Sequence, residues 1–552
     1  MTNLGDLEHT VRYFRQILLW PLQLLPMAEE DGRRHWQVLE ETQERSVWQR
    51  VVNEFADASR VSQEQYYKEF VVFLPYVRRF LYGESRGPWI HDEKDPAGES
   101  ALKVFRRRDV AALRLVLRTG TAPILLSVDG VELIFFDDID LVFLKVEISA
   151  TDLLLTTVRE MLYRFGRAYP TSWNEAGQGI HNVLSAEWLG TGGQALAASD
   201  SDNRMKFLAF SCQHRAPCTS AHWSFLLQPL VPAPAVEKGL IRFHQVEYHR
   251  IPMMAYLAVD DPRSITRDTW LRLGMIASLH PDEPIPRNDP DVFGFESHYC
   301  YDRYWTDTEA GPNSRFLCSG RVLLVVGDAR ESYFINAYRG MLAKFRHQYF
   351  IVFLIAHLHR ASLLIFSDRL VDAIHDLDIR QGNSVRTFRH RIHLSFETFL
   401  RFTHRYWFHK ISERDDIQSL LGLCGKWLGN DSLYEEVKEE LWDMSQYLDS
   451  DMQRRQSKTV VQLTVVTAFS LIGTIATGIL GMNIIDETGA PFWVRWGYFF
   501  LTVVVSATIM LLTVTKSRWL WDMMEIISDN RLSMRARLRQ IFQTKENPGK
   551  TH

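Results

Sequence analysis

The sequence predicts a cytoplasmic α/β domain, followed by a long helical stalk and two C-terminal transmembrane helices. Short runs rich in β-branched and aromatic residues occur between 121 and 330, and helical periodicity begins at about 331. Two apolar segments near the C-terminus, 460–480 and 492–515, are each long enough to cross a bilayer. The chain has 552 residues and a mean hydropathy of -0.16, so any membrane part is short and local.

Composition excludes several classes of protein. The net charge is -4, with 63 basic and 67 acidic side chains, whereas a nucleic-acid-binding protein usually shows a basic excess. The five cysteines are loosely spaced and odd in number, which is typical of a reducing cytoplasm. The N-terminal segment mixes charges into its apolar residues and lacks the core of a signal peptide, so we expect the large N-terminal part in the cytoplasm.

Residues 1–330 are expected to form the α/β domain. We predict that residues 1 to about 120 are mostly helical, with Pro75 kinking or breaking a helix over 63–82. Three strands follow within 121–150, with Asp129-Gly130 as a hairpin turn. Further predicted elements are a helix over 152–169, a loop-rich stretch over 170–235, and strands at 239–249, 253–259 and 321–327.

Residues 331–459 are expected to form a helical stalk region. One long helix is predicted over 339–379; His357, His359 and Arg360 interrupt its apolar core, which favours a buried soluble helix over a membrane span. A second helix is predicted over 385–414. A third begins near Asn430-Asp431-Ser432 and continues to about 480, a rod on the order of 70 Å long.

The two apolar segments predict a membrane hairpin, with residues 481–491 as the outer loop and 516–552 as a basic tail. Lys and Arg precede the first segment and follow the second, and Trp493, Trp496 and Tyr498 form an aromatic belt where the second begins. Both termini are therefore expected in the cytoplasm, with the turn outside.

The first membrane segment carries more polar groups than a passive anchor requires. One predicted helix face reads, from the turn inward, Gly478, Thr474, Leu471, Thr467, Thr464, Leu463, Val460, Ser457, Gln453 and Asp449. Hydroxyl and small residues near the outer end, followed by apolar residues, suit a hydrated pore with a hydrophobic constriction. The alternative is that Ser and Thr only bond back to their own helix.

The Gly481-Met482-Asn483 turn, an acidic loop and the aromatic start Trp496-Gly497-Tyr498 resemble the CorA family of magnesium channels, in particular a large bacterial subgroup with an extended N-terminal domain. The motif match covers about 445–518. The resemblance implies a funnel-shaped homopentamer in the bacterial inner membrane, with the first span lining a passive pore for Mg²⁺ or another divalent cation.

The resemblance also implies residue roles. Asn483 matches the asparagine of the outer selectivity ring, and Gly481 and Met482 shape its turn. Thr474 and Gly478 fall in the upper pore, and Leu471 and Leu463 at hydrophobic constrictions. Mg²⁺ holds its water shell tightly, so neutral amide oxygens can accept the hydrated ion.

The outer loop departs from the family, because it lacks Met-Pro-Glu and has Ile-Ile-Asp-Glu-Thr-Gly instead. Asp486 and Glu487 there could attract cations, or could form only a solvated turn. The family's regulatory metal sites cannot be placed by motif; the stalk acids Glu436, Glu439, Glu440, Asp443, Asp449 and Asp451 are candidates as a group.

Two alternative functions stay open. One is zinc transport of the ZntB type, with or without proton coupling, and the other is a non-conducting membrane-tethered sensor or scaffold. No catalytic motif or cofactor site is found, so no enzyme is predicted. Cys212, His214, Cys218 and His222 have metal-binding side chains without a recognised zinc spacing. His357, His359, His404 and His409 are expected to be core histidines, and Gly190–Gly193 is too short for a phosphate loop.

Overall fold

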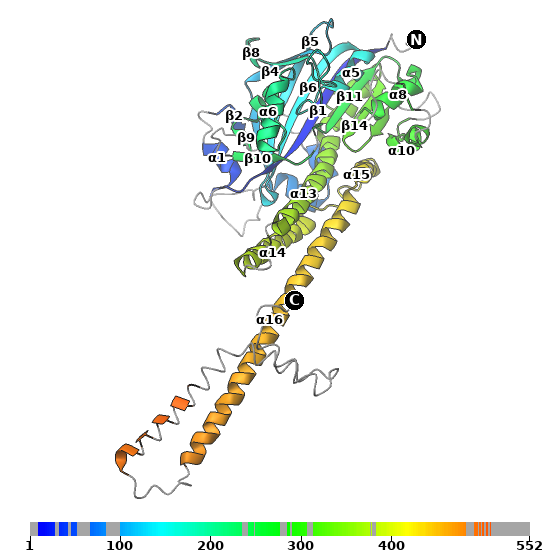
Figure 1. Ribbon diagram of the computed structural model, residues 1–552. Coiled ribbons are helices and arrows are strands. Elements are labelled where there is room, and N and C mark those ends of the chain that lie inside the picture. The colour runs from blue at the N-terminus through cyan, green and yellow to red at the C-terminus, as the bar shows by residue number, and fades with distance from the viewer. Residues whose placement is uncertain are drawn as a thin grey trace. The chain divides into compact units, whose positions relative to one another are not determined.

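The computed structural model (Figure 1) describes residues 9–27, 33–41, 46–51, 67–83, 100–233, 241–247, 249–276, 284–286, 290–305, 313–375, 377, 382–481, 491–494, 496–497, 500–501, 504–505 and 508. The chain divides into two compact units, Met1–Leu441 and Trp442–His552. We call them the N-terminal unit and the C-terminal unit. Helix α16 (Asn430–Gly481) passes from the first into the second without interruption.

The N-terminal unit is built on one mixed sheet, which has 14 strands in the described part of the chain. The strands are β1 (Thr10–Leu24), β2 (Trp48–Arg50), β3 (Leu102–Arg107), β4 (Val110–Val116), β5 (Ile124–Phe136), β6 (Leu141–Leu154), β7 (Ser185–Gly190), β8 (Ala195–Ala198), β9 (Leu230–Pro232), β10 (Ile241–Gln245), β11 (Met253–Val259), β12 (Cys300–Tyr301), β13 (Arg315–Cys318) and β14 (Val322–Asp328). The main path is β12-β13-β14-β11-β1-β6-β5-β4-β7-β8. β11 pairs with β14 in parallel, whereas β1 is antiparallel to both of its long neighbours, β6 and β11.

The helices and short helical turns are α1 (His35–Glu41), α4 (Pro75–Tyr82), η2 (Asp137–Ile139), α5 (Leu155–Arg164), α6 (Arg204–His214), α7 (Ala221–Leu227), η3 (Pro262–Ser264), α8 (Arg267–Gly274), α9 (Pro290–Phe293), α10 (Phe295–Tyr299), α11 (Ser332–Ile335), α12 (Met341–Lys344), the π-helix η4 (Phe345–Tyr349), α13 (Phe350–His375), α14 (Gly382–Arg405), α15 (Asp415–Leu428) and α16. α5 packs against β1 and β6, and α13 packs against β1 and α14 (Figure 1).

Strand β1 corrects the prediction that the first 120 residues are mostly helical. It is buried from Phe14 to Leu22 and pairs along most of its length with β6, for example Leu18 with Val146. A strand that is buried on both faces reads as a continuous apolar run, which periodicity cannot distinguish from a helix. The helix was predicted to kink or break at Pro75, and the structure has a break there, because α4 begins at Pro75.

The Asp129-Gly130 hairpin prediction is wrong. β5 continues through both residues, and the register shifts between Val128 and Gly130, so that Asp129 is the extra residue of a bulge. Gly130 has no positive φ, which a two-residue hairpin turn of this composition requires. The connection from β5 to β6 is η2. The predicted strands over 253–259 and 321–327 are confirmed as β11 and β14.

The predicted long helix is confirmed as the consecutive elements α12, η4 and α13. Met341–His375 is long and apolar enough to cross a membrane, but 78% of its most apolar window is buried inside the protein, and among the described residues it is the one helix identified on this basis. This burial agrees with the prediction that the helix is buried within the protein.

α14 ends nine residues before the predicted boundary of 414, at Arg405. The chain then turns inward, and Tyr406, Trp407 and Phe408 are buried. His404 and His409 are exposed, which corrects their prediction as core histidines. The Trp407 ring stacks on Tyr434 of α16, with ring centroids 4.6 Å apart, so the inward turn anchors the start of the long helix.

Candidate functional site

The predicted lining face of α16 is exposed along its whole length within the chain. All ten members of this face are exposed: Gly478, Thr474, Leu471, Thr467, Thr464, Leu463, Val460, Ser457, Gln453 and Asp449. On the opposite side of the helix Val465 is buried, and Gln462, Phe469 and Gly473 are half-buried. At 3.6 residues per turn these two sets lie on different faces. We call the exposed set the α16 face.

The threonines of the α16 face bond to their own helix. Thr464, Thr467 and Thr474 each donate the hydroxyl hydrogen to the carbonyl four residues earlier, at 2.9, 2.7 and 2.9 Å. The alternative considered from the sequence is therefore present in the structure. The same bond occurs at Thr508 in the second apolar segment, so it does not distinguish a lining helix from an anchor. It leaves each hydroxyl oxygen with free lone pairs.

An open groove of about 630 Å³ follows the α16 face. The described residues that line it are Val460, Leu463, Thr464, Thr467, Ser470, Leu471 and Thr474. Except for Ser470, all belong to the predicted lining face. The groove thus combines hydroxyl oxygens with branched apolar side chains.

The apolar members of the α16 face are unusually exposed for large side chains. Val460, Leu463 and Leu471 are 61%, 62% and 60% exposed. Single exposed leucines are ordinary, but a series along one helix indicates a surface that another molecule covers.

The second apolar segment has the same character in its described residues. Phe492 and Trp493 are 66% and 82% exposed, and Phe500, Leu501 and Val504 are each more than half exposed. Its aromatic start includes a Phe492–Trp496 contact with ring centroids 5.9 Å apart. Met482, Asn483, Asp486 and Glu487 lie outside the described residues, so their predicted roles stay predictions.

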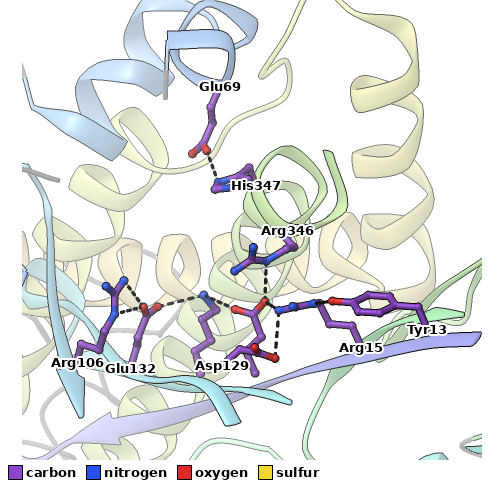
Figure 2. Close-up of polar contacts among 10 residues, drawn as sticks. Tyr13, Arg15, Glu69, Arg106, Asp129, Glu132, Arg346 and His347 are labelled. Carbon is purple, nitrogen blue, oxygen red and sulfur yellow. Dashed lines mark hydrogen bonds and ion pairs between the residues drawn. The ribbon is translucent and has the colours of Figure 1, made fainter. Parts of the chain in front are cut away.

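A network of buried charges, which the sequence analysis did not identify, joins the sheet to the start of α13 (Figure 2). Glu147 on β6 is buried and forms ion pairs with Arg15 of β1 and with Arg346 of η4, the latter at 2.9 Å. Lys145 lies 3.6 Å from Glu147 and 3.1 Å from Glu132. Burial alone would raise the pKa of Glu147, but the surrounding cations lower it to about 2.

Two irregular elements direct side chains toward this network. The β5 bulge places Asp129 3.4 Å from Arg15. In the π-helix η4, Arg346 reaches the network and the adjacent His347 lies 2.9 Å from Glu69 (Figure 2). The sequence did carry a signal for this network, because charged residues interrupt the apolar strand segments 131–136 (VELIFF) and 141–148 (LVFLKVEI).

Other predicted candidates do not assemble into a metal site. Cys212 is exposed whereas Cys218 and His222 are buried, and nowhere in the described ranges do three or more metal-binding side chains gather within the chain. The stalk acids are included in that result, except Asp451, whose side chain is not described. The glycine run Gly190–Gly193 forms the turn between β7 and β8, where Gly193 donates its backbone N–H to the Gly190 carbonyl.

Comparisons with protein-family models, curated proteins and solved structures found no match to this chain.

Proposed function

We propose that the chain is a subunit of a membrane channel for divalent metal cations, foremost Mg²⁺, and that the α16 face lines its conducting path. The observation that carries the proposal is the exposed face itself, on which hydroxyl oxygens alternate with large apolar side chains along a groove. One hairpin cannot enclose a water-filled path, so the proposal requires a ring of copies. The resemblance to the CorA family favours five.

The geometry of the threonines suits a hydrated dication. Mg²⁺ releases its octahedral water shell reluctantly, and the hydrogens of that shell point outward. Because each threonine donates its own hydrogen to the helix backbone, its hydroxyl oxygen remains available as an acceptor for those waters. A path lined in this way favours an ion that travels with its water.

The apolar residues would supply the gate. Rings of Leu471, Leu463 and Val460 around a narrow path can close it by dewetting, without a moving plug. In the open state, a negative cytoplasm favours entry by about 2.3 kcal/mol per charge for each 100 mV. This proposal places both termini in the cytoplasm and the chain in a bacterial inner membrane.

The test is divalent-cation uptake into proteoliposomes that contain the purified full chain and an internal indicator. We expect Mg²⁺ uptake driven by an inside-negative potential. The uptake rate should be at least about tenfold lower in the Asn483→Ala variant, because this variant lacks the ring of side-chain amides that would hold the hydrated ion. Asn174→Ala, in an exposed turn of the N-terminal unit, is the matched control and should conduct normally. Unchanged Mg²⁺ uptake in Asn483→Ala would contradict the proposal that Asn483 forms the selectivity filter.

Two further measurements distinguish the channel from the two alternative functions. Uptake of Zn²⁺ that requires a pH gradient would favour the proton-coupled zinc transporter. A monomeric or dimeric particle in detergent, without uptake of any divalent ion, would favour the tethered sensor or scaffold. The calculated mass of one copy is 64.3 kDa, so particle mass distinguishes these assemblies directly.

A further inference from the structure

Two buried arginine side chains lie beside each other near the C-terminal end of α5. Arg167 follows α5 and Arg250 precedes β11, and the two residues form an isolated antiparallel bridge. Backbone bonds flank the bridge, from the Ala168 N–H to the His249 carbonyl and from the Ile251 N–H to the Gly166 carbonyl. The arginines are only 8% and 4% exposed, so both guanidinium groups belong to the interior.

Few acceptors face these groups; the Tyr163 hydroxyl beside Arg167 is one of them. Arg250 donates from Nη2 to the Leu162 carbonyl at 3.0 Å, and Arg167 donates from Nη1 to Nε2 of His249 at 2.7 Å. Arg167 Nε and Arg250 Nε and Nη1 are buried N–H donors without a hydrogen-bond partner. Because arginine can only donate, His249 accepts through Nε2 and is neutral, with its hydrogen on Nδ1.

Their charge is also uncompensated. Within the described residues, no carboxylate forms an ion pair with Arg167 or Arg250. The nearby Glu247 is paired instead with Arg360, at 2.6 Å, and with Arg321, at 4.0 Å. Burial and the proximity of Arg167 lower the pKa of Arg250 to about 9, and burial with the neighbouring arginines lowers that of His249 to about 4.

Two features offset part of this cost. The guanidinium carbons of Arg167 and Arg250 lie 5.0 and 5.7 Å from the centre of the Tyr163 ring. The Leu162 carbonyl belongs to the last turn of α5, the negative end of its dipole. Each such interaction is weak compared with the free-energy penalty for burying an ion without a counterion. A counterion would account for the difference.

We propose that the N-terminal unit binds a small inorganic anion, a halide or a tetrahedral oxoanion, between Arg167 and Arg250. The three unpartnered N–H groups are its donors. Because these donors are buried, the anion must be small enough to enter the protein interior, which excludes a nucleotide. The site lies within the N-terminal unit, whereas the groove along the α16 face lies in the C-terminal unit.

The test uses the full chain in detergent, held at constant ionic strength while the bulky anion gluconate is replaced by chloride or by phosphate. The thermal unfolding midpoint should rise and saturate with the bound anion, because a ligand that binds only the folded state stabilises it. A response to chloride alone identifies a halide site, and a response to phosphate alone an oxoanion site. Both results support the proposal.

Arg250→Met should abolish the response. In gluconate its midpoint should equal or exceed that of the unsubstituted chain, since it removes a buried charge without a counterion. A merely structural arginine would instead cost stability in every buffer. Arg114→Met is the matched control, because Arg114 is exposed and paired with Glu187 at 2.9 Å, and it should keep the full response.

A direct measurement covers the case in which Arg250→Met does not fold. Crystals of the unsubstituted chain grown in bromide should show an anomalous-scattering peak between the two guanidinium groups if the site takes a halide, and sulfate or phosphate density there if it takes an oxoanion. An unfolding midpoint identical in all three anions, together with water alone at this position, would overturn the proposal.

Discussion

Two histidines on α13 are similarly buried, but only one of them has a hydrogen-bond partner. His359 is 5% exposed, and its Nε2 lies 2.7 Å from the Tyr406 carbonyl. His357 is 1% exposed and has no hydrogen-bond partner on either ring nitrogen, although the backbone of Gly320 approaches the ring. Burial lowers the pKa of His357 to about 3 and that of His359 to about 4, so both rings are neutral at pH 7.

This contrast predicts different costs for the same substitution. His357→Leu should be close to neutral in thermal stability at pH 7, because it removes a buried polar group whose partner is absent. His359→Leu leaves the Tyr406 carbonyl without its contact and should cost about 1–3 kcal/mol. The measurement is the unfolding midpoint of the full chain for each variant. Equal losses in the two variants would contradict this account.

At the scale of elements, α16 determines which side chains the C-terminal unit exposes. The αL residue Gly429 ends α15, and α16 begins at the next residue, where Asn430 donates from its side chain to the Ala356 carbonyl at 2.9 Å. From there one continuous helix leads to Gly481. The orientation of the α16 face along the helix therefore follows from where the helix starts.

The α16 face predicts a gating effect for Leu471. Leu471→Ser replaces a 60% exposed apolar side chain with a hydroxyl, which lowers the barrier to wetting a narrow path. We expect faster Mg²⁺ uptake than in the unsubstituted chain, in the proteoliposome assay. Leu501→Ser, with the same exposure in the second segment, is the control and should leave uptake unchanged. Unchanged or reduced uptake in Leu471→Ser would argue against a constriction at that level.

The sequence predicted elements best where one signal dominates. β11, β14 and the long α13 helix were predicted, since each is a strongly apolar run with clear ends. β1 was missed because burial on both faces hides the period of two. The helix α15 was not predicted, and α14 was extended too far, because tertiary packing of Tyr406 to Phe408 ends it. The face of α16 followed from helical spacing alone.

At the scale of the whole molecule, contacts between distant segments explain what the sequence could not show. Arg15 meets Glu147 and Arg346, and Arg167 meets Arg250, across separations that no local pattern records. Such pairs depend on the strand order, in which the N-terminal β1 lies between β6 and β11. A single sequence does not specify that order. The buried charges of the network had a sequence signal, but their partners and the arginine pair could not be predicted.

Buried neutral histidines also predict acid sensitivity for the molecule as a whole. Burial lowers the pKa of His222 and His357 to about 3 and that of His359 to about 4, below the ordinary value of 6.5. The unfolded chain therefore binds more protons below pH 6.5, so this stability is complete above pH 6.5 and is lost as the pH falls toward 4. Each group adds up to about 1.4 kcal/mol per pH unit.

The expected result is a thermal unfolding midpoint that decreases as the pH is lowered from 6.5 to 4.5. The decrease should be less steep in His357→Leu. Glu147 acts in a separate, more acidic window, because its lowered pKa contributes stability that is lost only as the pH drops from about 4.5 toward 2. A midpoint that stays level down to pH 4.5 would show that these histidines are not held neutral in the folded chain.

The unbroken course of α16 has an angular consequence. No proline occurs between Asn430 and Gly481, so every residue added to the stalk turns all later side chains by about 100° and advances them by about 1.5 Å. One inserted residue would carry Leu471 and Thr474 toward the side now occupied by Val465, whereas seven would restore their phase to within about 20°. Stalk length in this protein is thus restricted to steps that conserve helical phase.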